Sequence, residues 1–229
     1  MRLDETSHYD TEPVERLLNR LNARKAPYEV EFAGLQLRID EDVFCPTYTK
    51  TSAIMLEHLE TCDVSIETKS LDLFTGSGVF ALYMAKRGAL SVGVDISQKA
   101  VTCAQANAVR NKIAKRTCFL LGDGFSAIPA NARYDIVTAC PPLLPGHADS
   151  IIEKALVDDD LVSTFEFVRQ LPAYLSKDGY GLLFLSDVYQ RVYGDFEELA
   201  AKHGLTAHIA HSKNVGYEIY QIVELRHAA

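Results

Sequence analysis

The sequence predicts an α/β fold in which helices cover both faces of a mostly parallel sheet. Short apolar runs alternate with segments of helical periodicity from Leu71 to Ser186. The alternation is clearest where an apolar run ending at Asp72 is followed by a turn of small residues, a helical pattern and a second apolar run ending at Asp95. Such strand–turn–helix–strand units build parallel sheets.

The amino-acid composition indicates which kind of protein this is and which partners to expect. The 229 residues are 48% hydrophobic and 24% charged, with a formal net charge of −8, as in a soluble single-domain protein. The net charge is negative and no run of Lys or Arg is long enough to follow a phosphate backbone, so nucleic acid is disfavoured as a partner unless the charge is unevenly distributed over the surface. The five cysteines form no C-x-x-C pair and no apolar segment approaches a membrane span, which predicts a cytoplasmic protein without a membrane partner. His208 and His211, three apart on an expected strand, should face opposite sides, so we expect no metal site.

The N-terminal region is predicted to form a small cap on the main domain. Residues 11–23 have helical spacing with Pro13 in the first turn. Residues 28–39 alternate apolar and polar side chains on both sides of Ala33-Gly34, which indicates a β-hairpin. We therefore divide the chain into a helix-plus-hairpin cap, residues 1–42, and a main domain, residues 43–229.

The main domain begins with a turn-rich loop and then follows the alternating pattern. The expected helices are residues 53–60, 79–86, 100–111, a segment ending at Tyr174, and 195–203. The expected strands after the first two are residues 117–121, 134–139, 181–186, 206–211 and 217–225, of which the last two form a hairpin.

The turn after the first strand and the acid after the second predict a nucleoside-binding site. Gly76-Ser77-Gly78 lacks the third glycine of a dinucleotide fingerprint, so pyrophosphate is not the expected ligand. Asp95 lies 23 residues after Asp72, close to the offset of about 20 residues at which a carboxylate accepts hydrogen bonds from ribose hydroxyls. Asp72 carries a charge that disfavours phosphate and favours an ammonium group.

These residues carry a family resemblance. Asp72-Leu73-Phe74-Thr75-Gly76-Ser77-Gly78, followed by Val94-Asp95-Ile96-Ser97, Asn107-Ala108 and Asn111, resembles the cofactor motifs of class I S-adenosylmethionine-dependent methyltransferases. The branch that contains the release-factor glutamine and small-subunit ribosomal RNA guanine-N2 methyltransferases is the most similar. The resemblance implies a Rossmann-like, mostly parallel seven-stranded sheet and S-adenosyl-L-methionine as cofactor. In this interpretation Asp72 and the Thr75–Gly78 turn bind the methionine end, and Asp95 with Ile96 binds the ribose.

Two further segments match this family's cofactor and substrate positions. Asp123, flanked by glycines at a strand end, resembles the acid that contacts adenine, with Gly124 beside it and Phe125 as a wall of that site. In the loop before the first helix of the main domain, Pro46 and Thr51 match residues that pack over the methionine end, and Tyr48 is a candidate substrate contact. For any one residue of that loop, a capping or connecting role remains an equal alternative.

The turn Cys140-Pro141-Pro142-Leu143 is the candidate catalytic segment. Two prolines directly after a central strand force a stiff exit from the sheet, which aims backbone carbonyls into the pocket. The related enzymes carry Asn-Pro-Pro-Tyr here, where the amide oxygen and a proline carbonyl accept hydrogen bonds from the substrate's amino group and the ring stacks on it. Cys140 and Leu143 depart from that pattern, and the simplest role for Cys140 is a small buried thiol. Leu143 and His147 are candidate substrate contacts, although His147 equally suits an ordinary surface loop.

The leading expectation is a methyltransferase that acts on a nitrogen, or an oxygen, of a small-molecule acceptor, because the turn lacks its amide and aromatic groups. Two alternatives remain open. One is a protein or RNA N-methyltransferase that docks its acceptor through residues 1–45. The other is a catalytically silent protein that binds S-adenosylmethionine. The sequence leaves the oligomeric state open.

Overall fold

The structure is a computed structural model of the chain. It describes residues 27–145, 153–158, 161–187, 194–216 and 218–228, together with the single residues 16, 19 and 189. Of the helix predicted at residues 11–23, only Arg16 and Asn19 are described, both as helical. His147 lies outside the described residues.

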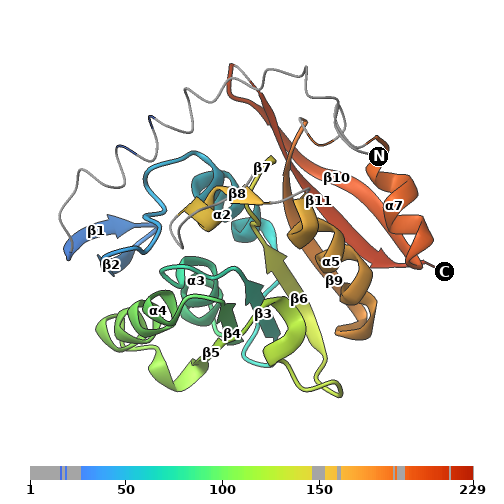
Figure 1. The fold of residues 1–229 in the computed structure, drawn as a ribbon. Coiled ribbons are helices and arrows are strands. Elements are labelled where there is room, and N and C mark those ends of the chain that lie inside the picture. The colour runs from blue at the N-terminus through green and yellow to red at the C-terminus, as the bar shows by residue number, and fades with distance from the viewer. Residues whose placement is uncertain are drawn as a thin grey trace.

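A seven-stranded sheet with the order β10-β11-β9-β6-β3-β4-β5 forms the centre of the molecule (Figure 1). Its strands are β3 (Lys69–Leu73), β4 (Leu90–Asp95), β5 (Thr117–Leu121), β6 (Tyr134–Ala139), β9 (Leu175–Ser186), β10 (Leu205–Asn214) and β11 (Ile219–His227). The five strands from β5 to β9 are parallel, and β11 is antiparallel to both of its neighbours. The predicted mostly parallel, seven-stranded sheet is therefore confirmed. The chain leaves β3 in one direction toward β5 and returns to β6 on its other side, which creates the switch point where open α/β sheets bind ligands.

Helices cover both faces of this sheet. The longer helices are α2 (Thr51–Thr61), α3 (Val79–Lys86), α4 (Gln98–Arg110), α5 (Val162–Gln170) and α7 (Phe196–Lys202), and the short 3-10 helices are η1 (Ala114–Arg116), η2 (Gly124–Ala127), η3 (Glu153–Ala155) and η5 (Leu171–Ala173). Alternate residues of one strand enter two separate cores: Leu182 and Phe184 of β9 pack with α2, α3 and α4, whereas Leu183 and Leu185 pack with α5 and α7. The period-2 alternation of a strand thus assigns each helix group to one face.

The predicted β-hairpin is confirmed. β1 (Tyr28–Phe32) pairs antiparallel with β2 (Leu35–Ile39) in the register Phe32 to Leu35. The two turn residues have positive φ values of 51° at Ala33 and 69° at Gly34, the conformation that matches the twist of a two-residue hairpin. Leu35, Leu37 and Ile39 are buried, so the hairpin joins the core on the α4 side.

Two amides on α4 attach the hairpin to the domain. Asn107 accepts a hydrogen bond from the Arg38 backbone N–H at 2.8 Å and donates to the Arg38 carbonyl at 3.0 Å. One helical turn later, Asn111 makes the same pair of bonds to Gln36, each 2.9 Å long. The two side-chain amides thus pair with backbone N–H and C=O groups of β2, as a neighbouring strand would. Asn107 also donates to the carbonyl of Ser77 at 3.1 Å, which connects the hairpin to the small-residue turn after β3.

Replacing Asn107 with alanine is expected to lower the free energy of unfolding by about 2 kcal/mol. The side chain is fully buried, and its loss leaves backbone groups of Arg38 and Ser77 without their partner. Asn111→Ala is the matched control, because its bonds are solvent-exposed and water replaces them at a cost of less than about 1 kcal/mol. Urea unfolding of the two variants measures the difference, and equal losses would contradict the anchoring role of Asn107.

Three local features differ from the sequence predictions. The helix expected to reach Tyr174 ends at Gln170, because Pro172 cannot donate the next helical hydrogen bond and the chain continues as η5. A short parallel pair, β7 (Leu144–Pro145) and β8 (Val157–Asp158), was not expected and lies just beyond the end of β6 (Figure 1). A bulge between Ile209 and His211 shifts the register, so His208 and His211 lie on one face of β10 rather than on opposite faces.

Two classes of feature are absent from the described part of the chain. It contains no helix long and apolar enough to cross a membrane. Within the same residues, no group of three or more His, Cys, Asp or Glu side chains is arranged to hold a metal ion.

Candidate active site

Two adjacent cavities lie at the carboxyl ends of the parallel strands. The first cavity has a volume of about 270 Å³ and the second a volume of about 510 Å³. The two cavities share five lining residues: Phe74, Asp95, Ile96, Pro142 and Lys154. The site is thus at the switch point of the sheet, where β3, β4 and β6 end.

The small-residue turn after β3 forms the floor of the first cavity. Thr75, Gly76 and Ser77 line it. Gly78 does not, because it faces α4, where an added Cβ would lie 2.9 Å from the Cβ of Ala104. Gly78 has a φ of 87°, which only glycine adopts without strain, and it starts α3. The glycines therefore bring the turn close both to the cavity and to α4.

Asp95 places a carboxylate where the two cavities meet. Its Oδ2 accepts a hydrogen bond from the Gly76 N–H at 2.8 Å, and its Oδ1 accepts one from the Ser97 N–H at 2.9 Å. Burial raises the pKa of Asp95, and the backbone donors oppose that rise. A carboxylate has acceptor capacity for further donors at this position. The arrangement fits the ribose-binding role predicted for Asp95.

Asp72 occupies a different place from the one expected. It is 2% exposed and does not line either cavity. Its carboxylate accepts hydrogen bonds from the hydroxyls of Thr75 at 2.6 Å and Thr138 at 2.8 Å. Burial nevertheless raises the pKa of Asp72 to about 7. Direct contact between Asp72 and an ammonium group is therefore not the geometry observed: Asp72 instead holds Thr75 at the start of the turn.

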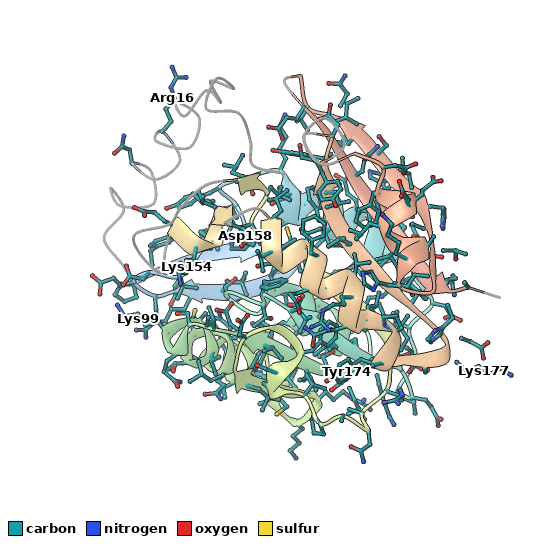
Figure 2. All side chains as sticks on the ribbon, turned by 45° about the vertical axis from the view of Figure 1, so that its right-hand side comes forward. Arg16, Lys99, Lys154, Asp158, Tyr174 and Lys177 are labelled. Carbon is teal, nitrogen blue, oxygen red and sulfur yellow. The ribbon has the colours of Figure 1, made fainter. Side chains whose placement is uncertain are left out.

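The second cavity contains the expected adenine-binding acid but not its expected wall. Asp123 and Gly124 line this cavity together with Ile96, which is half-exposed. Phe125 is buried against Tyr174, with ring centroids 4.5 Å apart, and it lines neither cavity. In Figure 2, Tyr174 lies far from Lys154, a residue of both cavities. The prediction of Phe125 as the wall is corrected: η2 turns the ring into the core, and Ile96 is the apolar neighbour of Asp123 in the cavity.

The proline turn after β6 lines the first cavity with all four residues from Cys140 to Leu143. Burial raises the pKa of the Cys140 thiol to about 12, and the side chain of Thr51 hydrogen-bonds to it. Such a raised pKa favours the neutral thiol over the thiolate and gives no support to a nucleophilic role for Cys140. Cys140 is half-buried at this strand end and is not one of the fully buried cysteines.

The loop before α2 contributes some but not all of its predicted residues. Pro46 and Thr51 line the first cavity. Tyr48 does not, because its hydroxyl accepts a hydrogen bond from the Tyr28 hydroxyl at 2.8 Å and its ring packs with the hairpin. The role of Tyr48 as a substrate contact is therefore corrected to a packing role between loop and hairpin.

Several residues that line the first cavity were not assigned from the sequence. They include Phe44, Lys154, Glu218 and Tyr220. Lys154 belongs to η3, which lies between β7 and β8 in the chain. Tyr220 of β11 and Glu218, the residue before this strand, reach the site because β11 runs antiparallel to β9 and so begins at the edge where the parallel strands end. The predicted final hairpin carries this signal in the sequence, because the second strand of such a hairpin begins at the edge of the sheet where the parallel strands end.

The described residues fit a sulfonium nucleoside. Asp95 presents a carboxylate to both cavities, in the position predicted to bind a ribose, and Asp123 presents one to the second cavity. Ser77 lines the first cavity with a buried hydroxyl that has no hydrogen-bond partner among the described residues, which leaves it available to a polar ligand group. A protein-family model described as "Methyltransferase small domain" matches residues 34–220. The chain belongs to this family.

This member of the methyltransferase small domain family is an S-adenosyl-L-methionine-dependent methyltransferase with the Rossmann-like fold of its class. It is 34% identical to the release factor glutamine methyltransferase of Streptococcus pneumoniae, over 63% of this chain and 52% of that protein. A Methanocaldococcus jannaschii protein, provisionally named as a protein N5-glutamine methyltransferase, is 30% identical over 66% of this chain and 75% of that protein. The chain spans about half the length of the curated release factor methyltransferases that it matches.

Solved structures share the fold. The Thermus thermophilus 16S rRNA N2 G1207 methyltransferase, solved with S-adenosylmethionine and guanosine, has a TM-score of 0.64 at 22% identity and matches 89% of this chain and 50% of that one. A ribosomal protein L11 methylase from Lactobacillus delbrueckii has a TM-score of 0.61 at 19% identity, over 83% of this chain and 86% of that one.

The expected partners require a correction. The relatives are named for methylation of release factors and of ribosomal protein L11, and one structural neighbour for methylation of 16S rRNA. The prediction of a small-molecule acceptor is therefore wrong, and so is the inference that a negative net charge disfavours nucleic acid. Net charge describes the whole surface and carries no information about one docking face.

Proposed function

We propose that the protein transfers a methyl group from S-adenosylmethionine to the side-chain amide nitrogen of a glutamine in a protein acceptor. One observation carries the proposal: a single cavity is lined both by the nucleoside-site residues Gly76 and Asp95 and by the proline turn. The acceptor nitrogen would enter beside that turn. A protein is favoured over RNA because relatives at 30% and 34% identity are named as protein glutamine methyltransferases, whereas the rRNA enzyme resembles the chain in fold.

In this proposal the chain's own residues align the reactants. Asp95 binds the ribose hydroxyls and Asp123 the adenine. The turn from Thr75 to Ser77 lies against the methionine end, with Pro46 and Thr51 closing the cavity above it. The sulfonium carries an activated methyl group, so alignment and exclusion of water supply most of the catalysis.

The stiff turn from Cys140 to Leu143 holds the acceptor, and residues 1–42 form a cap that contributes to docking the protein that carries it. The cap boundary is part of the proposal. Two observations support it: the hairpin is attached to α4 by side-chain amides, and Asp42 lies on the rim of the first cavity.

Label transfer from tritiated S-adenosylmethionine tests the function. The full chain is incubated separately with purified peptide-chain release factors, ribosomal proteins and ribosomal RNA of its own organism. We expect label in a protein, and peptide mass spectrometry should locate one added methyl group on a glutamine. Replacing that glutamine with glutamate should abolish labelling. Label found in RNA alone, or in none of the three preparations, would contradict the proposal.

A further inference from the structure

The proline turn gives the first cavity hydrogen-bond acceptors but only a weak side-chain acceptor. Pro141 and Pro142 line the cavity and carry no N–H group, so their backbones can offer a ligand only carbonyl oxygens. The raised pKa of Cys140 favours its neutral thiol, whose sulfur accepts hydrogen bonds weakly. A nitrogen held beside this turn therefore needs a stronger side-chain acceptor than Cys140.

The side chain of Thr51 lies directly against Cys140. Thr51 is the first residue of α2 and is 8% exposed, and both residues line the first cavity. The Thr51 side chain hydrogen-bonds to the Cys140 thiol, which joins the start of α2 to the end of β6. A hydroxyl oxygen is thus present at the first residue of the proline turn.

A second hydroxyl orients the first. The hydroxyl oxygens of Thr49 and Thr51 lie 2.7 Å apart, and Thr49 also lines the cavity. In either head-to-tail arrangement of the hydrogen bonds that run from Thr49 through Thr51 to Cys140, Thr51 donates one proton and accepts one. A hydroxyl oxygen has two acceptor positions, so Thr51 keeps one of them for a ligand that presents an N–H or O–H.

Strand register places Thr51 close to the nucleoside site as well. Leu73 of β3 pairs with Ala139 of β6, so the small-residue turn after β3 and the proline turn leave two neighbouring strand ends. Neighbouring strands lie about 4.8 Å apart. Because Thr51 contacts Cys140 at one of these ends, its hydroxyl lies where a group bound by the first turn meets a group bound by the second.

We propose that Thr51 positions the nitrogen to be methylated: its hydroxyl oxygen accepts a hydrogen bond from one N–H of that nitrogen, and a backbone carbonyl of the proline turn accepts the other. During transfer the carbon–sulfur bond breaks with its electron pair on sulfur, and the nitrogen lone pair forms the new carbon–nitrogen bond. The nitrogen then releases one proton to water. Two acceptors select a nitrogen with two N–H groups over a hydroxyl or an already methylated nitrogen. The inference rests on the proposed function for the identity of the amide.

A binding experiment tests Thr51 without any acceptor. The probe is an S-adenosylhomocysteine analogue in which a carbon bearing a primary amine replaces the sulfur, so that the amine stands where the transferable methyl group is. S-adenosylhomocysteine is its reference. Isothermal titration of the wild-type chain should show the analogue binding at least about 10-fold more tightly, because its N–H groups reach Thr51 and the turn. Thr51→Val, which keeps the shape and removes the hydroxyl, should reduce that preference at least about 5-fold.

Three further variants separate the hydroxyl from the local structure. Thr51→Ser retains the hydroxyl and should keep the preference within about 2-fold of wild type. Thr49→Val removes the partner that orients Thr51, so it should give an intermediate preference even if Thr51→Val fails to fold. Thr47→Val is the matched control and should leave the preference unchanged, because it removes an exposed hydroxyl of the same loop that lines neither cavity.

A crystal structure of the wild-type chain with the analogue measures the contact directly. The amine nitrogen should lie about 2.9 Å from Thr51 Oγ1. A separation of more than about 4 Å would overturn the assignment. So would a preference for the analogue that is absent in the wild type, survives in Thr51→Val, or is lost equally in Thr47→Val.

Kinetics with the labelled acceptor extend the test to transfer itself. Thr51→Val should lower kcat/KM about 10-fold and change the Kd for S-adenosylmethionine by less than about 3-fold. Cys140→Asn introduced into that variant should restore part of the lost rate, because it supplies an amide oxygen at the neighbouring position. Failure to label a protein would overturn only the proposed function, because the binding comparison uses no acceptor.

Discussion

Replacing Asp95 with alanine is expected to weaken S-adenosylmethionine binding by about 100-fold. The ribose hydroxyls would lose charge-assisted hydrogen bonds, which contribute about 1.5 to 3 kcal/mol each before water recovers part of the loss. A net loss of about 3 kcal/mol corresponds to two orders of magnitude in dissociation constant. Isothermal titration measures the change directly.

The control must separate ligand contact from local folding, because Asp95 also accepts hydrogen bonds from Gly76 and Ser97. Asp95→Asn keeps one acceptor oxygen and should lose less affinity than the alanine variant. Asp42→Asn removes a carboxylate from the same cavity that is paired with Lys99, and it should change affinity by less than about 3-fold. Unchanged affinity in Asp95→Ala would refute the nucleoside site as described here.

The raised pKa of Asp95 predicts that the affinity of the chain for S-adenosylmethionine depends on pH. Burial raises the pKa of Asp95, and only the ionised carboxylate accepts hydrogen bonds at both oxygens. As pH falls, the affinity of the wild-type chain should therefore begin to decrease at a higher pH than for a solvent-exposed aspartate. Asp95→Asn should lack this dependence.

The parallel part of the fold was predictable because each strand carries its own local signal. β6 matches the predicted residues 134–139 at both ends, and the hairpin turn at Ala33-Gly34 has the backbone that its sequence indicates. The start of β9 was less predictable: residues 177–179 have the sequence of a turn but lie within β9, where the register with β6 shifts between Tyr134 and Ile136. Propensity describes a segment alone, whereas pairing with a neighbouring strand can override it.

The candidate site shows a similar division. Glycine and acid positions at strand ends follow from the chain order, so Gly76, Asp95 and Asp123 were found where the cavities are. The direction in which a side chain points at a strand end does not follow from the order of residues along the chain. Asp72 points to Thr138 rather than to the cavity, and Phe125 enters the core. Glu218 was missed because it reaches the site through the direction of β11, a property of sheet topology.

The buried carboxylate of Asp72 should make the protein's stability depend on pH in an unusual direction. Burial raises the pKa of Asp72 from an ordinary 3.8 to about 7, even though two threonine hydroxyls donate to it. Between those pH values the folded chain binds more protons at this site than the unfolded chain. The free energy of unfolding therefore falls as pH rises through this window, and the contribution levels off above about pH 7.

Asp72→Asn isolates that contribution, because asparagine keeps the shape and does not titrate. Its amide can accept from one threonine hydroxyl and donate to the other, since a hydroxyl serves in either role. A shift of about three pKa units corresponds to about 4 kcal/mol as an upper value. The variant should therefore gain up to that amount relative to wild type between about pH 4 and pH 8, as measured by urea unfolding at each pH. Asp63→Asn, at an exposed loop position, is the matched control for the loss of a surface carboxylate. A flat difference curve for Asp72→Asn would show that the buried carboxylate is stabilised in its charged form by the threonines, and that its role in positioning Thr75 does not require a proton.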